Sequence, residues 1–227
     1  MLSQEDIKKQ LGKYAADLVP GNAIIGLGSG STIYWLIEGL ANRMQQGLSL
    51  KVVPTSTQTK SLAEKAGITT VDLNDIDVLP LTIDGADEID GQFQLIKGGG
   101  GALLREKMVA SASEQLIIIA DDSKCVPQLG RFPLPVEVIP SGWKQVQKKI
   151  LALGCKKVAL RKEHTQAFIT DNGQHILDCY FEKIDDAGAL NISLHLIPGV
   201  VETGLFINMT HATVIGYADG TIEMKVK

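Results

Sequence analysis

Short apolar strands alternate with amphipathic helices through the first half of the chain, and this alternation constrains the fold more than any other feature. Apolar periodicity predicts helices over 3–18, 31–46, 56–66 and 101–113. It predicts strands over 22–27, 50–53, 70–71, 79–83 and 115–120. Strands separated by helices of this length form a parallel sheet with helices on both faces. The first half is therefore predicted to be Rossmann-like.

The pattern changes near Arg131, where two prolines follow in Phe-Pro-Leu-Pro. Beyond this point the sequence predicts strands over 134–139, 155–161, 166–170, 175–181 and 200–207, and helices over 142–153 and 185–195. Residues 171–173 (Asp-Asn-Gly) predict a tight hairpin turn between two of these strands. An order of strand, helix, antiparallel strands, helix and strand resembles the ferredoxin-like unit.

The final segments, 212–217 and 221–226, predict a hairpin that returns to the first domain. The expected fold class is α/β, with a Rossmann-like parallel-sheet domain over 1–131 plus 205–227. An inserted, smaller α+β ferredoxin-like domain is expected over 132–204.

Charge and composition exclude several classes of protein. The 22 Lys and Arg against 26 Asp and Glu give a net charge of −4, which argues against non-specific nucleic-acid binding. No apolar run reaches the ~18 residues of a membrane helix, and the N-terminus lacks a basic segment followed by an apolar one. The three cysteines lack metal or disulfide spacing and are expected to be small buried residues. We therefore expect a cytoplasmic protein that binds neither nucleic acid nor membrane.

Glycine exceeds its average share, with 23 residues against roughly 16 expected at about 7%. Residues 26–32 (Gly-Leu-Gly-Ser-Gly-Ser-Thr) follow a strand and open a helix, where backbone amides and the hydroxyls of Ser29, Ser31 and Thr32 suit a phosphate. The glycines lack the spacing of a dinucleotide fingerprint, and no Walker lysine follows. A tight turn with a serine cap is the alternative interpretation.

Residues 84–88 (Asp-Gly-Ala-Asp-Glu) follow the strand over 79–83. Ligands bind at the carboxyl ends of parallel strands, so Asp84 and Asp87 are placed to bind sugar hydroxyls or to act on a proton. Taken alone, the segment is equally consistent with a solvated Asx turn. No His or Cys lies nearby, and no metal site is expected.

Four consecutive glycines, 98–101, follow Lys97 and precede the helix over 101–113. Such a run offers close backbone approach and free amides for developing negative charge. Glu106 on that helix could project back toward the loop, although Arg105-Glu106-Lys107 alone is typical of a solvated helix face. Lys124 follows the strand over 115–120 and could reach the same edge of the sheet, although a lone loop lysine is usually solvated.

A parallel sheet would bring these strand-end segments into one crevice. The set holds an anion cradle, two aspartates, a lysine beside an amide-rich loop and one glutamate, but no Ser-His-Asp grouping or nucleotide motif. These groups suit proton transfer next to a carbonyl on a phosphorylated, hydroxyl-rich substrate. A carboxylate would act as base, while a cation and amides would stabilise an enediolate.

Five motifs occur in one order: G-L-G-S-G-S-T, D-G-A-D-E, K-G-G-G-G-A-L-L-R-E-K, F-P-L-P-V-E-V-I-P and I-P-G-V-V-E-T-G-L-F. In this combination the chain resembles the type A ribose-5-phosphate isomerase family over nearly its whole length. The resemblance implies interconversion of ribose 5-phosphate and ribulose 5-phosphate through a cis-enediol, without metal or cofactor. It also implies a pentose 5-phosphate as the small-molecule partner. A homodimer or homotetramer is implied as well, and we expect the domain over 132–204 to mediate assembly.

The resemblance also implies roles for individual residues. Glu106 matches the glutamate that moves the proton between C2 and C1. Asp84 and Asp87 match acids that bind sugar hydroxyls, with Asp84 also acting in ring opening. The loop around the reacting oxygens comprises Lys97, Gly98, Gly99 and Gly100. The remaining substrate positions, chiefly phosphate contacts, are Ser29, Gly30, Ser31, Thr32, Lys124 and Lys8, and the acidic loop adds Gly85 and Ala86.

Two other functions are consistent with parts of this pattern. A non-catalytic sugar-phosphate-binding sensor domain of related fold would not need Glu106, and one helix before the first strand leaves no room for a helix-turn-helix. An aminosugar-phosphate deaminase or isomerase would need a histidine near the acids. All four histidines lie in the second half and are expected to be structural or exposed.

Overall fold

The protein is described by a computed structural model of residues 1–227, in which the chain forms two compact units. The first unit comprises Met1–Ala86, Arg105–Lys124 and Met209–Lys227, and the second comprises Asp87–Leu104 and Cys125–Asn208. The predicted α/β fold class is confirmed. The bounds differ from the predicted 1–131 plus 205–227, because β5 (Glu88–Ile89) and β6 (Leu95–Ile96) pair with each other and β6 pairs with β14 (Leu205–Phe206), outside the large sheet.

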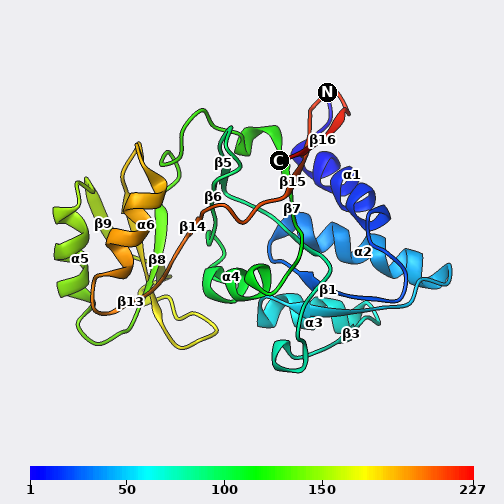
Figure 1. Ribbon diagram of the computed structural model, residues 1–227, viewed down its shortest axis with the longest axis horizontal. Coiled ribbons are helices and arrows are strands. Elements are labelled where there is room, and N and C mark those ends of the chain that lie inside the picture. The colour runs from blue at the N-terminus through cyan, green and yellow to red at the C-terminus, as the bar shows by residue number, and fades with distance from the viewer. The chain divides into compact units, whose positions relative to one another are not determined.

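Seven strands form the sheet of the first unit, in the order β16-β15-β7-β4-β1-β2-β3 (Figure 1). Their bounds are β1 Ala23–Leu27, β2 Leu50–Pro54, β3 Thr69–Thr70, β4 Thr82–Asp84, β7 Leu116–Asp121, β15 Ala212–Gly216 and β16 Ile222–Val226. All neighbours are parallel except β16, which pairs antiparallel with β15 as the sequence predicted. The chain runs from β1 to β2 on one side and later returns to β4 on the other. The topological switch point, where ligands bind in such sheets, therefore lies between β1 and β4.

Helices cover both faces of this sheet. One face packs against α1 (Gln4–Asp17) and α2 (Ser31–Gln45), with Leu11, Ile25 and Leu36 in its core. The opposite face packs against α4 (Leu103–Ser111) through Val53 and Val109. The remaining helical segments are α3 (Thr57–Lys65), η1 (Leu73–Asp75) and η2 (Asp122–Lys124).

The predicted cap of the first helix is present. The Ser3 hydroxyl accepts the Asp6 N–H at 3.2 Å, and the Asp6 carboxylate accepts the Ser3 N–H at 3.2 Å. These bonds satisfy two donors that a helix start leaves without intrahelical partners. The Ser3 hydroxyl also donates to the Asp6 carboxylate at 2.6 Å, and this bond, with that from the Ser3 N–H, holds the pKa of Asp6 below its usual value.

Helices α1 and α2 meet at Gly12, where no side chain fits. A Cβ at Gly12 would lie 2.6 Å from the backbone nitrogen of Leu36. The higher helix propensity of alanine would stabilise the fold by about 1 kcal/mol, but overpacking destabilises it by about 1–3 kcal/mol or more. The clash is not easily relieved, because the atoms of α2 that the Cβ meets include backbone atoms, which cannot rotate away as a side chain can. We expect Gly12→Ala to lower the free energy of unfolding by about 1–2 kcal/mol in urea titrations. Gly21→Ala, whose Cβ would meet no atom within 4 Å, is the matched control; equal stability of the two variants would contradict the prediction.

The second unit contains the predicted ferredoxin-like arrangement. Its order is β8 (Leu134–Val138), α5 (Trp143–Ala152), β9 (Lys157–Leu160), β12 (His175–Tyr180), α6 (Ala187–His195) and β13 (Val200–Thr203). These four strands form an antiparallel sheet in the order β13-β8-β12-β9. A small hairpin of β10 (Lys162–Glu163) and β11 (Gln166–Ala167) lies between β9 and β12 in the chain.

Two local predictions in this unit were wrong. The turn over 171–173 forms, with Gly173 at a φ of +76°, but β11 pairs with β10 and β12 pairs with β8 and β9. The predicted strand over 200–207 is divided into β13 and β14, which belong to different sheets. The division occurs at Gly204, where a Cβ would lie 2.8 Å from Pro135 Cδ.

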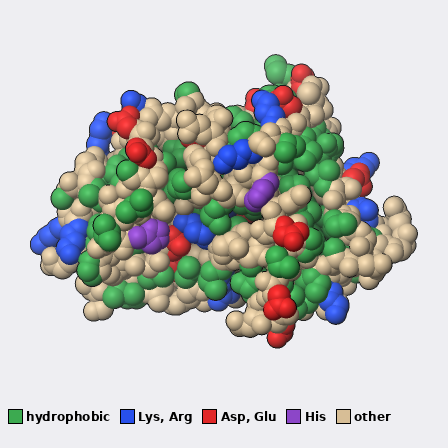
Figure 2. Space-filling model, in the orientation of Figure 1, with side chains coloured by type: hydrophobic (Ala, Val, Ile, Leu, Met, Phe, Trp, Pro, Cys, Tyr) green, Lys and Arg blue, Asp and Glu red, His purple; other side chains and the backbone are tan.

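The surface agrees with the modest net charge. On the face shown in Figure 2, basic and acidic side chains are interspersed and do not form a large patch of one sign. No helix combines the length and apolar character needed to cross a membrane.

Cys155 and Cys179 are buried as predicted, and burial raises the pKa of the Cys179 thiol well above its usual value. The prediction was wrong for Cys125, which is exposed just after η2.

Candidate active site

The loop after β1 leads into a helix N-terminus whose amides could bind an anion. Gly30 precedes α2 with a φ of +105°, which favours glycine, and no side chain caps this helix. The first amides of a helix have no intrahelical acceptor, so the N–H groups of Ser31 and Thr32 can donate to an anion. The structure therefore places Gly30, Ser31 and Thr32 as the sequence predicted, at the carboxyl end of β1.

Ser29 differs from its neighbours because its hydroxyl contacts other protein hydroxyls. Its Oγ lies 2.9 Å from Thr55 Oγ1, 2.9 Å from Ser56 Oγ and 3.1 Å from Thr59 Oγ1. These partners follow β2, and Thr59 also donates to the carbonyl of Gly28 at 2.9 Å. This hydroxyl cluster fixes the loops after β1 and β2 against each other, so the Ser29 hydroxyl positions the loop that precedes α2.

Asp84 ends β4 and joins it to the loop after β1. Its Oδ1 accepts the N–H of Ser29 at 3.1 Å and that of Gly85 at 2.7 Å, and the residue is completely buried. Gly85 and Ala86 follow it at the same edge and are half-buried. The switch point between β1 and β4 thus holds a buried carboxylate beside a helix N-terminus.

Two lysines lie at the same edge of the sheet. Lys124 is half-buried in η2, directly after β7. Lys8 is half-buried on α1 beside Ile7, and a Cβ on Gly216 at the carboxyl end of β15 would lie 2.7 Å from Ile7 Cγ2. The edge therefore has a lysine after β7, a carboxylate after β4 and amides after β1, while Lys8 lies on α1 next to a residue that packs at the end of β15.

Glu106 lies on α4, which packs against the face of this sheet opposite α1 and α2. The helix begins at Leu103 rather than at the predicted 101, because Gly101 has a φ of +86°. Glu106 therefore lies in the first turn, where the positive end of the helix dipole favours a carboxylate. The residue is only 5% exposed. Since burial of a carboxylate is costly, a solvated helix face is excluded as the explanation of Glu106.

Asp87, Lys97 and the glycine-rich loop lie in the second unit, where Asp87 contacts the loop. The Asp87 carboxylate accepts the N–H of Gly99 at 2.7 Å, and the Asp87 N–H donates to Ile96 at 2.9 Å. Lys97 is buried, with Nζ 5.4 Å from the centroid of the Phe206 ring. A turn closes the loop, because the Gly101 N–H donates to the Gly98 carbonyl at 2.9 Å.

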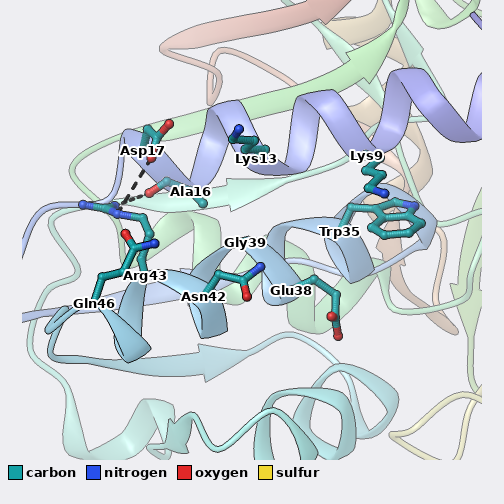
Figure 3. Close-up of a pocket in the computed structure, with 10 residues that line it drawn as sticks. All are labelled: Lys9, Lys13, Ala16, Asp17, Trp35, Glu38, Gly39, Asn42, Arg43 and Gln46. Carbon is teal, nitrogen blue, oxygen red and sulfur yellow. Dashed lines mark hydrogen bonds and ion pairs between the residues drawn. The ribbon is translucent and has the colours of Figure 1, made fainter.

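A separate hollow lies between α1 and α2 (Figure 3), and none of the predicted site residues lines it. Its charged groups contact the helices themselves. Arg43 donates to the carbonyls of Ala16 and Val19 at the end of α1 and lies 3.8 Å from Asp17. Lys9 Nζ lies 5.4 Å from the Trp35 ring centroid. These contacts are explained by the packing of the two helices.

Comparison with known proteins gives the family. Residues 51–220 match the sequence profile described as ribose 5-phosphate isomerase A (phosphoriboisomerase A). The protein named ribose-5-phosphate isomerase A from Bacillus mycoides is 53% identical over 219 residues, which cover 96% of this chain and 99% of that protein. The chain belongs to the ribose 5-phosphate isomerase A family. The predicted resemblance is thus confirmed.

Solved structures of ribose 5-phosphate isomerases share the fold over the full chain. The enzyme from Plasmodium falciparum has a TM-score of 0.95 at 39% identity, covering 98% of this chain and 99% of its own. A D-ribose-5-phosphate isomerase in complex with phospho-erythronic acid also has a TM-score of 0.95, at 35% identity with 100% of both chains covered. The match extends through both units.

Two features of this family member escaped sequence reasoning. The hydroxyl cluster of Thr55, Ser56 and Thr59 was missed, although residues 55–59 (Thr-Ser-Thr-Gln-Thr) follow Pro54 at the end of the second strand and repeat the hydroxyl-rich character of the loop after β1. Arg161 was also missed. Its guanidinium donates to carbonyls of the glycine-rich loop, and no local pattern marks it.

Proposed function

We propose that the chain is an aldose-ketose isomerase that interconverts ribose 5-phosphate and ribulose 5-phosphate, with Glu106 as the base. Family membership gives the reaction. The observation that supports the base is the burial of Glu106, 5% exposed, in the first turn of α4. A sheet edge in the same unit carries a helix N-terminus without a side-chain cap, together with a buried aspartate. The non-catalytic sensor is not favoured, because the relatives are named as enzymes.

The proposed chemistry moves one proton between adjacent carbons. Glu106 takes the proton from C2 of the open-chain aldose, and negative charge develops on the C1 oxygen as the cis-enediolate forms. The base then returns the proton to C1, while the proton of the C2 hydroxyl passes to the C1 oxygen, so that C2 becomes the ketone carbon and C1 carries the hydroxyl. Atoms and charge balance with no redox partner, and the proposal includes no metal or cofactor.

The residues of the second unit are proposed to stabilise the developing charge. Lys97 supplies a cation, and the loop of Gly98, Gly99 and Gly100 lies around the reacting oxygens, where its N–H groups other than that of Gly99, which is donated to Asp87, can bind them. Asp84 and Asp87 are proposed to bind the sugar hydroxyls, with Asp84 also assisting ring opening. Chain continuity supports a role for both groups on one substrate, because Asp84 and Asp87 are separated by two residues and the glycine run continues into the helix of Glu106.

The phosphate is assigned to the edge of the large sheet. The amides at the start of α2 and the cations of Lys124 and Lys8 would bind it there. The ligand of one solved relative, phospho-erythronic acid, fits this set of groups. Such a ligand carries a phosphate, hydroxyls and a planar carboxylate that resembles an enediolate in charge and shape. We expect the chain to bind it more tightly than ribose 5-phosphate.

The test of the proposed function is direct conversion. Purified protein is mixed with ribose 5-phosphate in excess chelator, and ketose formation is followed over time. Conversion at the same rate with and without chelator supports the proposal. No conversion would overturn the function, and chelator-sensitive conversion would overturn the metal-free mechanism.

Lys124→Ala should mainly weaken substrate binding. Loss of a charge-assisted hydrogen bond to phosphate costs about 1.5–3 kcal/mol, so KM should rise about tenfold or more while kcat changes little. Steady-state kinetics with ribose 5-phosphate measure this. Lys225→Ala is the control. Lys225 on β16 lies opposite Thr213, near the amino end of β15 and so away from the proposed phosphate site, and its Nζ lies 3.1 Å from the Glu223 carboxylate. An unchanged KM in Lys124→Ala would remove Lys124 from the phosphate site.

We also propose a cytoplasmic homodimer or homotetramer. Sugar phosphates are charged metabolites retained inside cells, which supports the compartment. Assembly through the second unit is supported by two exposed apolar residues, Ile192 on α6 at 64% and Leu196 directly after this helix at 77%. Light scattering on the eluting protein should give two or four chain masses, and a monomer at micromolar concentration would contradict the proposed assembly.

A further inference from the structure

Arg161 contacts the glycine-rich loop although it lies about sixty residues further along the chain. It follows β9 directly, and its Nη1 donates to the carbonyls of Gly98 at 2.9 Å and Gly99 at 3.0 Å. Both carbonyls belong to the loop assigned above to the reacting oxygens. One guanidinium therefore binds two successive peptide groups of this loop.

A second contact fixes the guanidinium itself. Asp178 on β12 accepts from Arg161 Nε at 3.1 Å and from Nη2 at 2.5 Å, and the two side chains are 15% and 17% exposed. This paired geometry uses the planar fork of arginine, which lysine cannot reproduce. Phe168 packs nearby, with its ring centroid 5.9 Å from Arg161 Cζ, and a Cβ on Gly101 would lie 2.5 Å from that ring.

The contacts determine which way the loop amides face. The Gly98 carbonyl and the Gly99 N–H belong to one peptide group, whose carbonyl is bound by Arg161 and whose N–H is bound by Asp87 at 2.7 Å. In a trans peptide, C=O and N–H point in opposite directions. Because Arg161 also binds the Gly99 carbonyl, the Gly100 N–H must point away from Arg161. Consecutive glycines have little intrinsic preference between peptide orientations, so this order comes from the partners.

We propose that Arg161, held by Asp178, is a positioning residue that presents the Gly100 N–H to the developing oxyanion of the enediolate. The inference rests on the proposed function and adds a residue that acts through the loop without touching the substrate. Donors fixed in place before the reaction need no reorganisation as charge develops, and this is their catalytic value. Loss of Arg161 would leave the donors present but no longer fixed.

The test compares Arg161→Ala and Arg161→Lys with the wild type. Removal of an oxyanion donor costs about 10²–10³ in kcat, and misplacement of one should cost about 10- to 100-fold. We expect this loss in kcat for Arg161→Ala, with KM and the inhibition constant of inorganic phosphate within about twofold, because the phosphate groups are untouched. The inhibition constant of phospho-erythronic acid should rise about as much as kcat falls.

Two further readouts separate positioning from a structural role. Millimolar guanidinium chloride should restore part of the activity of Arg161→Ala, because free guanidinium can occupy the vacated place, and should not activate Arg161→Lys. The pH profile of kcat should keep its shape, because the base is unchanged. Lys156→Ala is the matched control, since Lys156 makes an exposed ion pair with Glu182 in the same unit; it should retain wild-type kinetics.

Each outcome decides one proposal. An inactive wild type would overturn the proposed function. An active wild type with unchanged kcat in both Arg161 variants would overturn the positioning role alone. Equal losses in kcat and phosphate affinity, without guanidinium rescue, would show that Arg161 has only a structural role and would also overturn the positioning role. If Arg161→Ala does not fold, Arg161→Lys provides the test: a loss in kcat with an unchanged inhibition constant of inorganic phosphate supports the positioning role, and equal losses in both overturn it.

Discussion

Glu106→Gln should reduce kcat by about 10²- to 10⁴-fold or more, because general-base catalysis typically contributes a factor in this range. The amide has nearly the shape of the carboxylate but cannot accept a proton from carbon. KM and inhibition by inorganic phosphate should change little, because the phosphate is assigned to other residues. Steady-state kinetics on both substrates would measure the loss, which should be equal in the two directions because one base serves both.

The matched control is Glu114→Gln, an exposed carboxylate shortly after α4. It removes the same charge from the same unit without affecting the reaction. Thermal unfolding of both variants separates loss of fold from loss of chemistry. A Glu106→Gln variant with near-normal turnover would exclude Glu106 as the base, whatever its burial.

The sequence predicted the first unit well because each of its main helices and strands is determined by residues close together in the chain. Ser3 caps a helix predicted over 3–18 and observed over Gln4–Asp17, and the helix predicted over 31–46 is observed over Ser31–Gln45. Each helix has an apolar periodicity of its own and a clear start and end. The return of the final hairpin to this sheet was predictable for the same reason, since both strands alternate around a turn at Asp219-Gly220.

The short strands could not be predicted in this way. β5, β6 and β14 have two residues each, too few for any periodicity. The pairing of β6 with β14 joins segments more than a hundred residues apart, such as Ile96 with Leu205. The domain bounds depend on these pairings, and for this reason the predicted and observed divisions of the chain differ.

The residues of the candidate site likewise fall into those that local patterns predict and those that only tertiary packing brings together. Asp84, Gly30 and Glu106 could be proposed because each lies next to a strand end or helix start that the pattern reveals. The Ser29 hydroxyl partners lie 26 to 30 residues away, and the loop partner Arg161 lies 62 to 63 residues away. A single sequence carries no signal for such contacts, since they depend on how the elements pack.

Gly28→Ala should affect the site almost as strongly as loss of the base, although glycine itself carries no chemistry. A Cβ at Gly28 would overlap the Asp84 carboxylate and lie 2.6 Å from Asp84 Cα. Gly28 cannot move aside easily, because its N–H donates to Ile83 at 2.9 Å and its carbonyl accepts from Thr59 at 2.9 Å. The carboxylate must therefore move, and its bonds to the N–H groups of Ser29 and Gly85 must break.

Displacement of a positioning group by about 1 Å can cost about 10² in rate, so kcat/KM of Gly28→Ala should fall about 100-fold or more. Stability should fall by about 1–3 kcal/mol, as for other overpacked sites. Kinetics at a temperature where circular dichroism shows a folded protein, together with urea titration, measure the two effects. Gly21→Ala, just before β1 with no atom within 4 Å of its Cβ, should match the wild type in both. Wild-type kinetics in Gly28→Ala would mean that the geometry around Asp84 Oδ1 does not govern the reaction, and Asp84 would lose its assigned role.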